Sequence, residues 1–411
     1  MPKSINATIA PRIAYDKVTK TTNSAIMTGG LSAEWPPMPK IPHIFSALPS
    51  CQHQLKYYIY SLIFYYVSVT VQLVVIRRFI KSMSSSKVRV YFLSSGRIGI
   101  PIVDALCHDT ELELVGIGSQ PDKEAGRKKK LAPTPLAKHV QEKLGLSVEK
   151  PATVNSPDFL EHLKDLGVEL LVVASFGQIL KPALLDLPRL GCLNVHASLL
   201  PKYRGAAPIS QVILDGDEET GVTFMKMDPG LDTGPIYCES KCRICPTENV
   251  VQLEDRLGEL AAGSIGDVIR KIADGSLNPR PQPAEGSTYA KKIKKTDGAA
   301  DWNLPATVLA RKVRAYYSWP SLFALLPIGG NYKRISIKEA APIDLQHASK
   351  PGTILVATPK SLVIACGQGA LNIIRLIPEG KKEMSASEFL RGTQVAEGDE
   401  LPPSTGDFLT Q

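Results

Sequence analysis

The sequence predicts an α/β protein in which a parallel-sheet domain precedes a small β-barrel or open-sheet domain. From residue 88 onward, short apolar runs alternate with amphipathic stretches, the pattern of strands joined by helices. Three prolines within residues 278–283 then interrupt regular structure. Beyond them, short β-type runs separated by Gly/Pro turns are typical of a small β domain.

The composition is that of a globular protein. Its 411 residues suffice for roughly two or three domains, and the fractions of hydrophobic (44%) and charged (21%) residues are ordinary. Seven cysteines suit free thiols in a reducing compartment better than a disulfide scaffold. Of the formal charge of +8, residues 1–82 contribute +7 through nine Lys/Arg against two Asp/Glu. The bulk charge therefore does not by itself indicate a nucleic-acid partner.

The N-terminal segment differs from the rest of the chain. Residues 1–56 are rich in Pro, Ser and Thr, which predicts disorder. Residues 57–76 carry no charge and have the length of a membrane span, but they include five tyrosines. They fit a membrane anchor, an organelle transit segment, or a disordered or mis-assigned extension outside the functional protein. We favour the third, because Met83 follows directly and a strand begins five residues later.

Four apolar runs define the expected parallel sheet: residues 88–93, 112–117, 169–174 and 192–196. Helices are expected at residues 135–146 and 157–166, the second after Ser156 as N-cap. Helices between strands cover both faces of such a sheet, and its ligand site lies at the carboxyl ends of the strands. The chemistry is therefore expected just after these runs.

The second half of the chain begins with a long helix over residues 248–273. We place a linker at residues 278–297, between a domain of residues 83–277 and a second domain of residues 298–411. In the second domain we expect a helix and then four β-type runs: residues 306–317, 333–337, 353–357, 361–365 and 372–377.

Asn194 and His196 are the first candidate site residues. Alternate residues of a strand project to the same side, so both lie together at a strand end, where an amide and an imidazole can donate to a developing oxyanion. Asp232 lies in a Gly-rich loop, from which a carboxylate can raise the basicity of a histidine. A packed histidine and a turn-capping aspartate are the plainer interpretations.

Three motifs in this order resemble those of the methionyl-tRNA formyltransferase family. They are Asn-x-His at residues 194–196, Ser-Leu-Leu-Pro at 198–201 and Gly-Leu-Asp-Thr-Gly at 230–234. The resemblance runs from about residue 88 to the 390s and is bacterial in style. It implies a Rossmann-like parallel-sheet formyltransferase domain followed by a small OB-like β-barrel domain that binds tRNA.

The resemblance also implies the reaction. The α-amino group of methionine on initiator tRNA takes the formyl group of 10-formyltetrahydrofolate, the step that prepares this tRNA for translation initiation. Asn194 and His196 would stabilise the oxyanion, and Asp232 would set the protonation of His196. The folate would contact Ser198, Leu199, Leu200 and Pro201. No metal is needed.

A run of four cations is the predicted contact with tRNA: Arg127, Lys128, Lys129 and Lys130. On composition alone such a run is a solvated loop, whereas the resemblance implies that it enters the tRNA acceptor arm, where cations grip phosphates. The basic residues at 291–295 and 311–314 extend this track.

Other interpretations share parts of this pattern. The core motifs also suit a sugar-amine formyltransferase or a formyltetrahydrofolate hydrolase, and a real membrane span at residues 57–76 would suit a tethered, non-catalytic binding protein. Cys238, Cys242 and Cys245 lack a second ligand pair for zinc. We expect a cytoplasmic monomer of bacterial type, without a stable protein partner or a membrane, or a mitochondrial or plastid protein if residues 1–82 are a transit segment.

Overall fold

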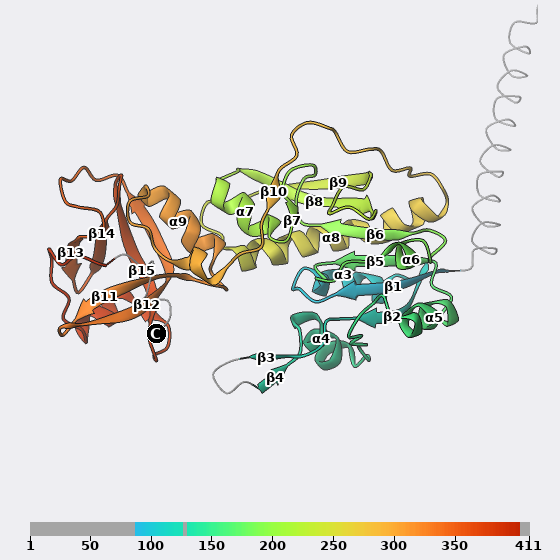
Figure 1. Cartoon of the computed structure of the whole chain (residues 1–411), viewed down its shortest axis with the longest axis horizontal. Helices are drawn as coiled ribbons and strands as arrows, with labels where there is room; N and C mark the ends of the chain where they lie inside the picture. The colour runs from blue at the N-terminus through green and yellow to red at the C-terminus, as the bar shows by residue number, and fades with distance from the viewer. Residues whose placement is uncertain (1–86, 126–129, 403–411) are drawn as a thin grey trace, which may run out of the picture. The chain divides into compact units, whose positions relative to one another are not determined.

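The computed structural model describes residues 87–125 and 130–402 (Figure 1). The predicted extension of residues 1–82, its uncharged stretch 57–76, and Arg127, Lys128 and Lys129 lie outside the described residues. Within the described ranges, the longest and most apolar helices fall short of what crossing a bilayer requires.

The first sheet has six strands, and the four predicted from the sequence form its parallel part. In spatial order these are β2 (Leu112–Gly118), β1 (Val88–Ser94), β5 (Leu170–Ala174) and β6 (Cys192–His196). Two further strands extend the sheet beyond β6, both antiparallel to their neighbours: β8 (Glu219–Lys226) and β9 (Ile236–Arg243). The sheet is therefore mixed, with a parallel core, and the sequence analysis missed its antiparallel edge.

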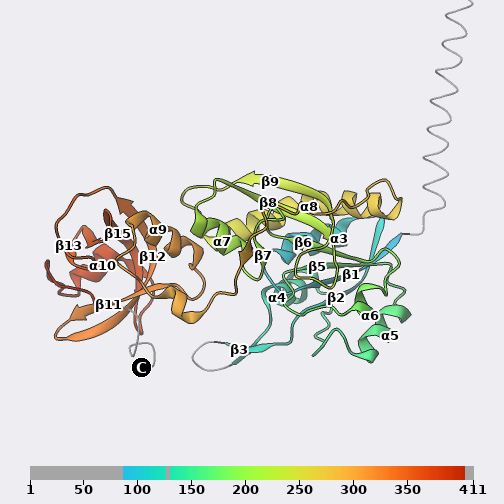
Figure 2. The ribbon, with the colours of Figure 1, turned by 45° about the horizontal axis from the view of Figure 1, so that its top comes forward.

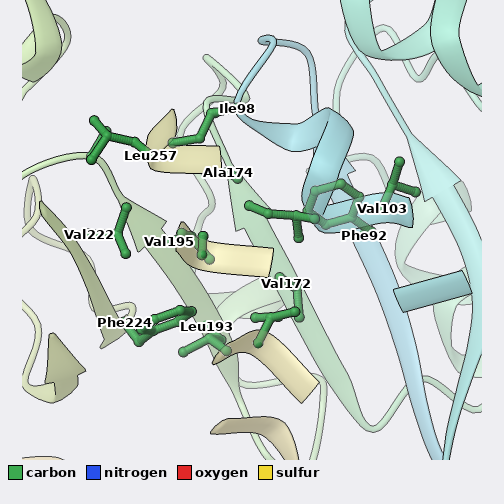
Figure 3. Packing of buried hydrophobic residues seen from close by; sticks show 14 of the residues in the cluster. Phe92, Ile98, Val103, Val172, Ala174, Leu193, Val195, Val222, Phe224 and Leu257 are labelled. Carbon is green, nitrogen blue, oxygen red and sulfur yellow. The ribbon is translucent and has the colours of Figure 1, made fainter. Parts of the chain in front are cut away.

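Alternate residues of the central strands pack into two different cores. On β1, Val90 and Phe92 belong to a first cluster of buried residues, whereas Tyr91 and Leu93 face a second cluster with Phe159 on the opposite side. Figure 3 shows the first cluster, in which Val172 of β5 lies near Phe92. Both faces of the sheet are thus buried, as a parallel sheet requires.

The same alternation orients β6. Leu193 and Val195 point into the first cluster (Figure 3). Because successive strand residues point to opposite faces, Asn194 and His196 face away from that cluster. The strand therefore presents both polar side chains together near its carboxyl end.

Helices and short strands complete this region. The first cluster draws on α3 (Gly99–His108), α7 (Pro208–Asp215) and α8 (Val250–Ala273), and the second on α5 (Pro157–Asp165) and α6 (Pro182–Leu185). Beside them lie α4 (Pro135–His139), continued by a π-helical turn (Val140–Leu144), and a hairpin of β3 (Lys123–Ala125) and β4 (Lys130–Ala132) that projects from the sheet (Figure 2).

Helix starts follow local capping chemistry. Ser156 is the N-cap of α5, as predicted, and its hydroxyl accepts the Phe159 amide at 3.3 Å. Helix α8 begins two residues later than predicted, because Asn249 and Gln252 form a reciprocal capping box.

The C-terminal sheet is antiparallel throughout and curls into a half-barrel. Its strand order is β11 (Leu322–Ile328), β12 (Asn331–Ile343), β15 (Ala370–Pro378), β14 (Ser361–Ala365) and β13 (Ile354–Thr358), and β16 (Met384–Ser385) pairs with β15. Register shifts on either side of Glu339 bend the long β12, as bulges do. Helices α9 (Ala306–Ala315) and α10 (Ala386–Arg391) contribute to its core.

The segment between α8 and α9 pairs with the first domain rather than running free. Its strand β10 (Tyr289–Ala290) lies parallel to β7 (Arg204–Gly205) (Figure 1). A 3-10 turn (Lys295–Gly298) then leads toward α9. This segment, residues 274–305, contains the whole of the predicted linker of residues 278–297.

Candidate active site

The three predicted catalytic side chains lie together at the end of β6. The Asn194 amide Nδ2 donates to Oδ1 of Asp232 at 3.3 Å, and Nδ1 of His196 lies 3.7 Å from Oδ2 of the same carboxylate. The side chains of His196 and Asp232 are only 6% and 14% exposed. A mostly enclosed carboxylate thus contacts both members of the Asn-x-His pair, although it is 38 residues from Asn194 in sequence.

The two ring nitrogens of His196 have different partners. Nε2 lies 2.9 Å from the carbonyl oxygen of Tyr203, which can only accept a hydrogen bond. Nε2 therefore carries a proton in both charge states of the ring. In the neutral ring, Nδ1 is therefore left as an acceptor on the side of Asp232.

Asp232 is held in an uncommon conformation by its surroundings. Its φ of +53° lies in the left-handed region, which residues with a Cβ rarely adopt. Oδ2 accepts the backbone amide of Gly205 at 2.8 Å. The carboxylate therefore does cap a backbone amide, as the plainer interpretation proposed, while it also contacts the Asn-x-His pair.

A cleft of about 980 Å³ opens beside these residues. This volume is at the upper end of the range for small-molecule sites, roughly 300–1,000 Å³. Asn194, His196 and Asp232 line it, together with residues 176–180 after β5. The sequence analysis missed residues 176–180, although the rule that singles out the carboxyl ends of strands also points to them.

Two further polar groups line the cleft. Glu254 on α8 accepts the Ile98 amide at 3.2 Å, and burial raises the pKa of its carboxyl group above the usual range. The Gln120 side chain contributes an enclosed Nε2 with no hydrogen-bond partner among the described residues. Such a donor is normally satisfied in native proteins, so an acceptor on a bound ligand is its expected partner.

The predicted folate loop, residues 198–201, is hydrogen-bonded to the turn that follows it and to β8. The Ser198 hydroxyl donates to the Lys202 carbonyl at 2.7 Å, and the Leu200 amide donates to the Thr223 hydroxyl at 3.1 Å. None of the residues 198–201 is among those that line the cleft within the described part of the chain. The structure therefore places this loop behind the catalytic residues rather than on the cleft wall.

Of the four predicted tRNA contacts, the structure describes Lys130, which is exposed at the start of β4. Lys123, on the other strand of the hairpin, lines the cleft. The basic residues near α9 have partners within the protein: Arg311 donates to the Asp215 carbonyl at 3.3 Å, and Arg314 to the Glu248 carbonyl at 3.1 Å. Burial lowers the pKa of Lys312.

Cysteines and other metal-binding side chains do not gather in the part that the structure describes. Cys238 and Cys242 lie in β9, and Cys245 follows it. Within residues 87–125 and 130–402, groups of three or more His, Cys, Asp or Glu side chains suited to a metal ion are absent.

Comparison with known proteins shows extensive similarity. A formyl transferase family model matches residues 88–269, and a model of the formyl transferase C-terminal domain matches residues 292–394. The methionyl-tRNA formyltransferase of Trichlorobacter lovleyi is 38% identical over 77% of this chain and 97% of its own length. That of Xylella fastidiosa is 41% identical over 74% of this chain and 96% of its own length.

A solved structure shares the fold at lower sequence similarity. HypX from Aquifex aeolicus, crystallised in complex with tetrahydrofolic acid, is 17% identical. The alignment has a TM-score of 0.52 and covers 74% of this chain and 47% of that longer chain.

Proposed function

Because the chain belongs to the formyl transferase family, we propose that it transfers the formyl group of 10-formyltetrahydrofolate to the α-amino group of methionine on initiator tRNA. The observation that carries this proposal is the near full-length match to curated methionyl-tRNA formyltransferases across both domains. The enzyme is thus a transferase that prepares the initiator for translation.

Formyl transfer requires a new bond between the α-amino nitrogen and the formyl carbon. The bond from that carbon to N10 of the folate breaks, and one proton passes from the amine to the folate nitrogen. The formyl oxygen gains negative charge on the way. Groups already in place to meet that charge lower the barrier without reorganising.

Asn194 and His196 are the proposed donors to that oxygen. One hydrogen of the Asn194 amide is used by Asp232, which leaves the second for the substrate. His196 can donate from Nδ1 only as an imidazolium, with the Asp232 carboxylate 3.7 Å away as its counterion. When His196 is neutral, Nδ1 can instead accept a proton from the amine. We assign Asp232 the task of shifting this balance.

The cleft fits the folate co-substrate. Its volume suits a large ligand, and Phe176 and Leu180 give it apolar walls. The enclosed Nε2 of Gln120 can donate a hydrogen bond to an acceptor on the folate. We expect residues 176–180 to contact the folate directly. The loop formed by Ser198, Leu199, Leu200 and Pro201 stays a predicted folate contact, which would act by shaping the wall from behind.

The tRNA acceptor arm is proposed to approach over the β3–β4 hairpin. Lys123 lines the cleft and Lys130 is exposed on the neighbouring strand, so cations extend from the site onto the hairpin. Arg127, Lys128 and Lys129 complete the proposed contact. We further propose that the chain acts as a monomer in the cytoplasm.

A transfer assay tests the proposal directly. The full chain is incubated with 10-formyltetrahydrofolate and methionyl initiator tRNA, and the formylated aminoacyl-tRNA is measured. Formylation confirms donor and acceptor together. Release of formate without formylated tRNA would point to a hydrolase or a smaller amine acceptor, and an inert protein would contradict catalysis altogether.

A further inference from the structure

Gln282, in the segment between α8 and α9, joins two loops of the candidate active site. Its amide Nε2 donates to the carbonyl oxygens of Asp232 and Gly234, both at 2.8 Å. Its Oε1 accepts from Nη2 and Nε of Arg204, at 2.6 and 3.1 Å. Both donor hydrogens and the acceptor oxygen are therefore used, and all on groups 48 to 78 residues away in sequence.

The turn at Asp232 needs such restraints. A left-handed backbone at a residue with a Cβ persists only where the surrounding structure over-determines it. The Asp232 side chain is fixed by Asn194 and by the Gly205 amide. Gln282 instead holds the main chain, at Asp232 itself and two residues beyond. Side chain and backbone are thus restrained separately.

The segment that carries Gln282 is itself anchored on both sides of this residue. Arg280 pairs with Ile236 through two backbone hydrogen bonds, of 2.7 and 2.8 Å. The Thr288 hydroxyl accepts the amide of Tyr203 at 2.8 Å, and Tyr203 is the residue whose carbonyl binds His196. Residues 280–290 therefore contact the loops that supply both partners of the His196 ring.

We propose that Gln282 is a positioning residue for formyl transfer. Its amide fixes the turn that directs the Asp232 carboxylate toward Asn194 and His196, and it ties that turn to Arg204 of β7. Gln282 acts through Asp232 and is not assigned a contact with either substrate. This inference rests on the proposed function, since it assigns a residue to the same reaction.

The substitution Gln282→Ala tests the role by separating kcat from KM. Misplacement of a catalytic group lowers turnover without weakening uniform binding, so kcat should fall roughly ten- to a hundredfold. The KM values for folate and tRNA should stay within about twofold. The matched control is Glu285→Ala, which truncates an exposed side chain of the same segment and should leave kcat unchanged.

A double-mutant cycle with Asp232→Ala distinguishes positioning from general damage. If Gln282 acts through Asp232, Gln282→Ala should change kcat by less than about twofold in the Asp232→Ala background, because residues that act as a unit are non-additive. Equal losses in both backgrounds would overturn the proposal, and so would a normal kcat for Gln282→Ala.

A second variant covers a failure of Gln282→Ala to fold. Gln282→Glu keeps an acceptor for Arg204 but presents a carboxylate oxygen to the two carbonyls, so it should lose kcat to a similar extent. Unchanged turnover by Gln282→Glu would refute the role. Turnover by the unaltered chain reports on the proposed function separately, since only the ratio between variants bears on Gln282.

Discussion

Asn194 and His196 at the end of one strand, together with Asp232 from a distant loop, form the centre of the candidate site. His196 is bound through Nε2 to a backbone carbonyl, so its exchangeable proton sits on Nδ1, beside Asp232. The ring is enclosed, with 6% of its side chain exposed, and the Asp232 carboxylate is its neighbour on the Nδ1 side. Substitutions of His196 and Asp232 therefore test the proposed mechanism most directly.

We expect His196→Ala and Asp232→Ala each to lower kcat by a factor on the order of one hundred or more, the effect of removing an oxyanion-stabilising group. Steady-state formyl transfer to methionyl-tRNA measures this. Melting temperatures of both variants serve as the folding control. Near-normal turnover in either variant would remove that residue from the proposed mechanism.

Gly205 is expected to tolerate no side chain. Its φ is +109°, and a Cβ would lie 2.8 Å from the Ala290 carbonyl oxygen, against the partner strand β10. Gly205→Ala should therefore cost about 1–3 kcal/mol in the free energy of unfolding and lower kcat, since the Gly205 amide holds Asp232. Urea denaturation measures the first effect.

The matched control for Gly205 is Gly286→Ala. Gly286 has a φ of +80°, but a Cβ there would meet nothing within 4 Å. It shares the backbone strain without the collision. Equal losses of stability and equal kcat in the two variants would show that the contact with β10 is unimportant.

The strand period of two and the position of the strand's carboxyl end predicted Asn194 and His196 together. Asp232 was predicted from its Gly-rich loop and from the family resemblance. Sequence reasoning missed Gln282 and the Tyr203 carbonyl. Those contacts depend on how distant loops pack, and nothing in the local pattern around a Pro-rich segment encodes them. A hydrogen bond to a backbone carbonyl does not depend on which residue supplies that carbonyl, so the sequence does not reveal it.

Among the elements, the parallel strands were predictable and the antiparallel edge was not. Strand β6 has the predicted bounds, and β5, a fully buried and continuous apolar run, begins one residue later than predicted. Strand β9 carries Glu239, Lys241 and Arg243 in alternation with less polar residues, so its apolar signal is weak. In the C-terminal domain, β14 was predicted fully, whereas β11 was missed.

At the scale of a helix, Asn249→Ala should destabilise the protein by about 1 kcal/mol. The Asn249 side chain accepts the amides of Val251 and Gln252, at 3.0 and 3.1 Å, and thereby satisfies the exposed first turn of the 24-residue α8. The free energy of unfolding in urea measures the loss. The control Gln252→Ala removes only the reciprocal bond and should cost less; the reverse order would contradict this account of the cap.

For the whole molecule, the proposed tRNA contact predicts a steep dependence of affinity on salt. Each phosphate contact contributes a slope of about −0.9 to the dependence of log K on log salt concentration for a duplex. Lys130→Ala should reduce that slope by about one. Lys164→Ala, on α5 and paired with Glu161, is the control and should leave it unchanged. An affinity for tRNA independent of salt would contradict the proposed approach over the hairpin.

A chain that begins at Met83 should be soluble and fully active. The two family models match residues within 88–394, and the first described strand begins at Val88. The measurement compares kcat and the soluble fraction of the shortened and full chains. Insolubility or loss of turnover would contradict the interpretation that residues 1–82 lie outside the functional protein.

The pairing of β10 with β7 also determines where modules can be exchanged between relatives. Consider a chimera that joins the first domain of this chain to the second domain of a relative. If the junction lies within the Pro-rich run, the relative supplies Gln282, Thr288 and β10, whose partners belong to this chain. A junction beyond Ala290 would keep each of them with its own partners. Chimeras produced by natural recombination or by laboratory shuffling should therefore be active more often when the junction lies downstream of Ala290. The prolines, which the sequence alone indicates as the domain boundary, are the poorer junction.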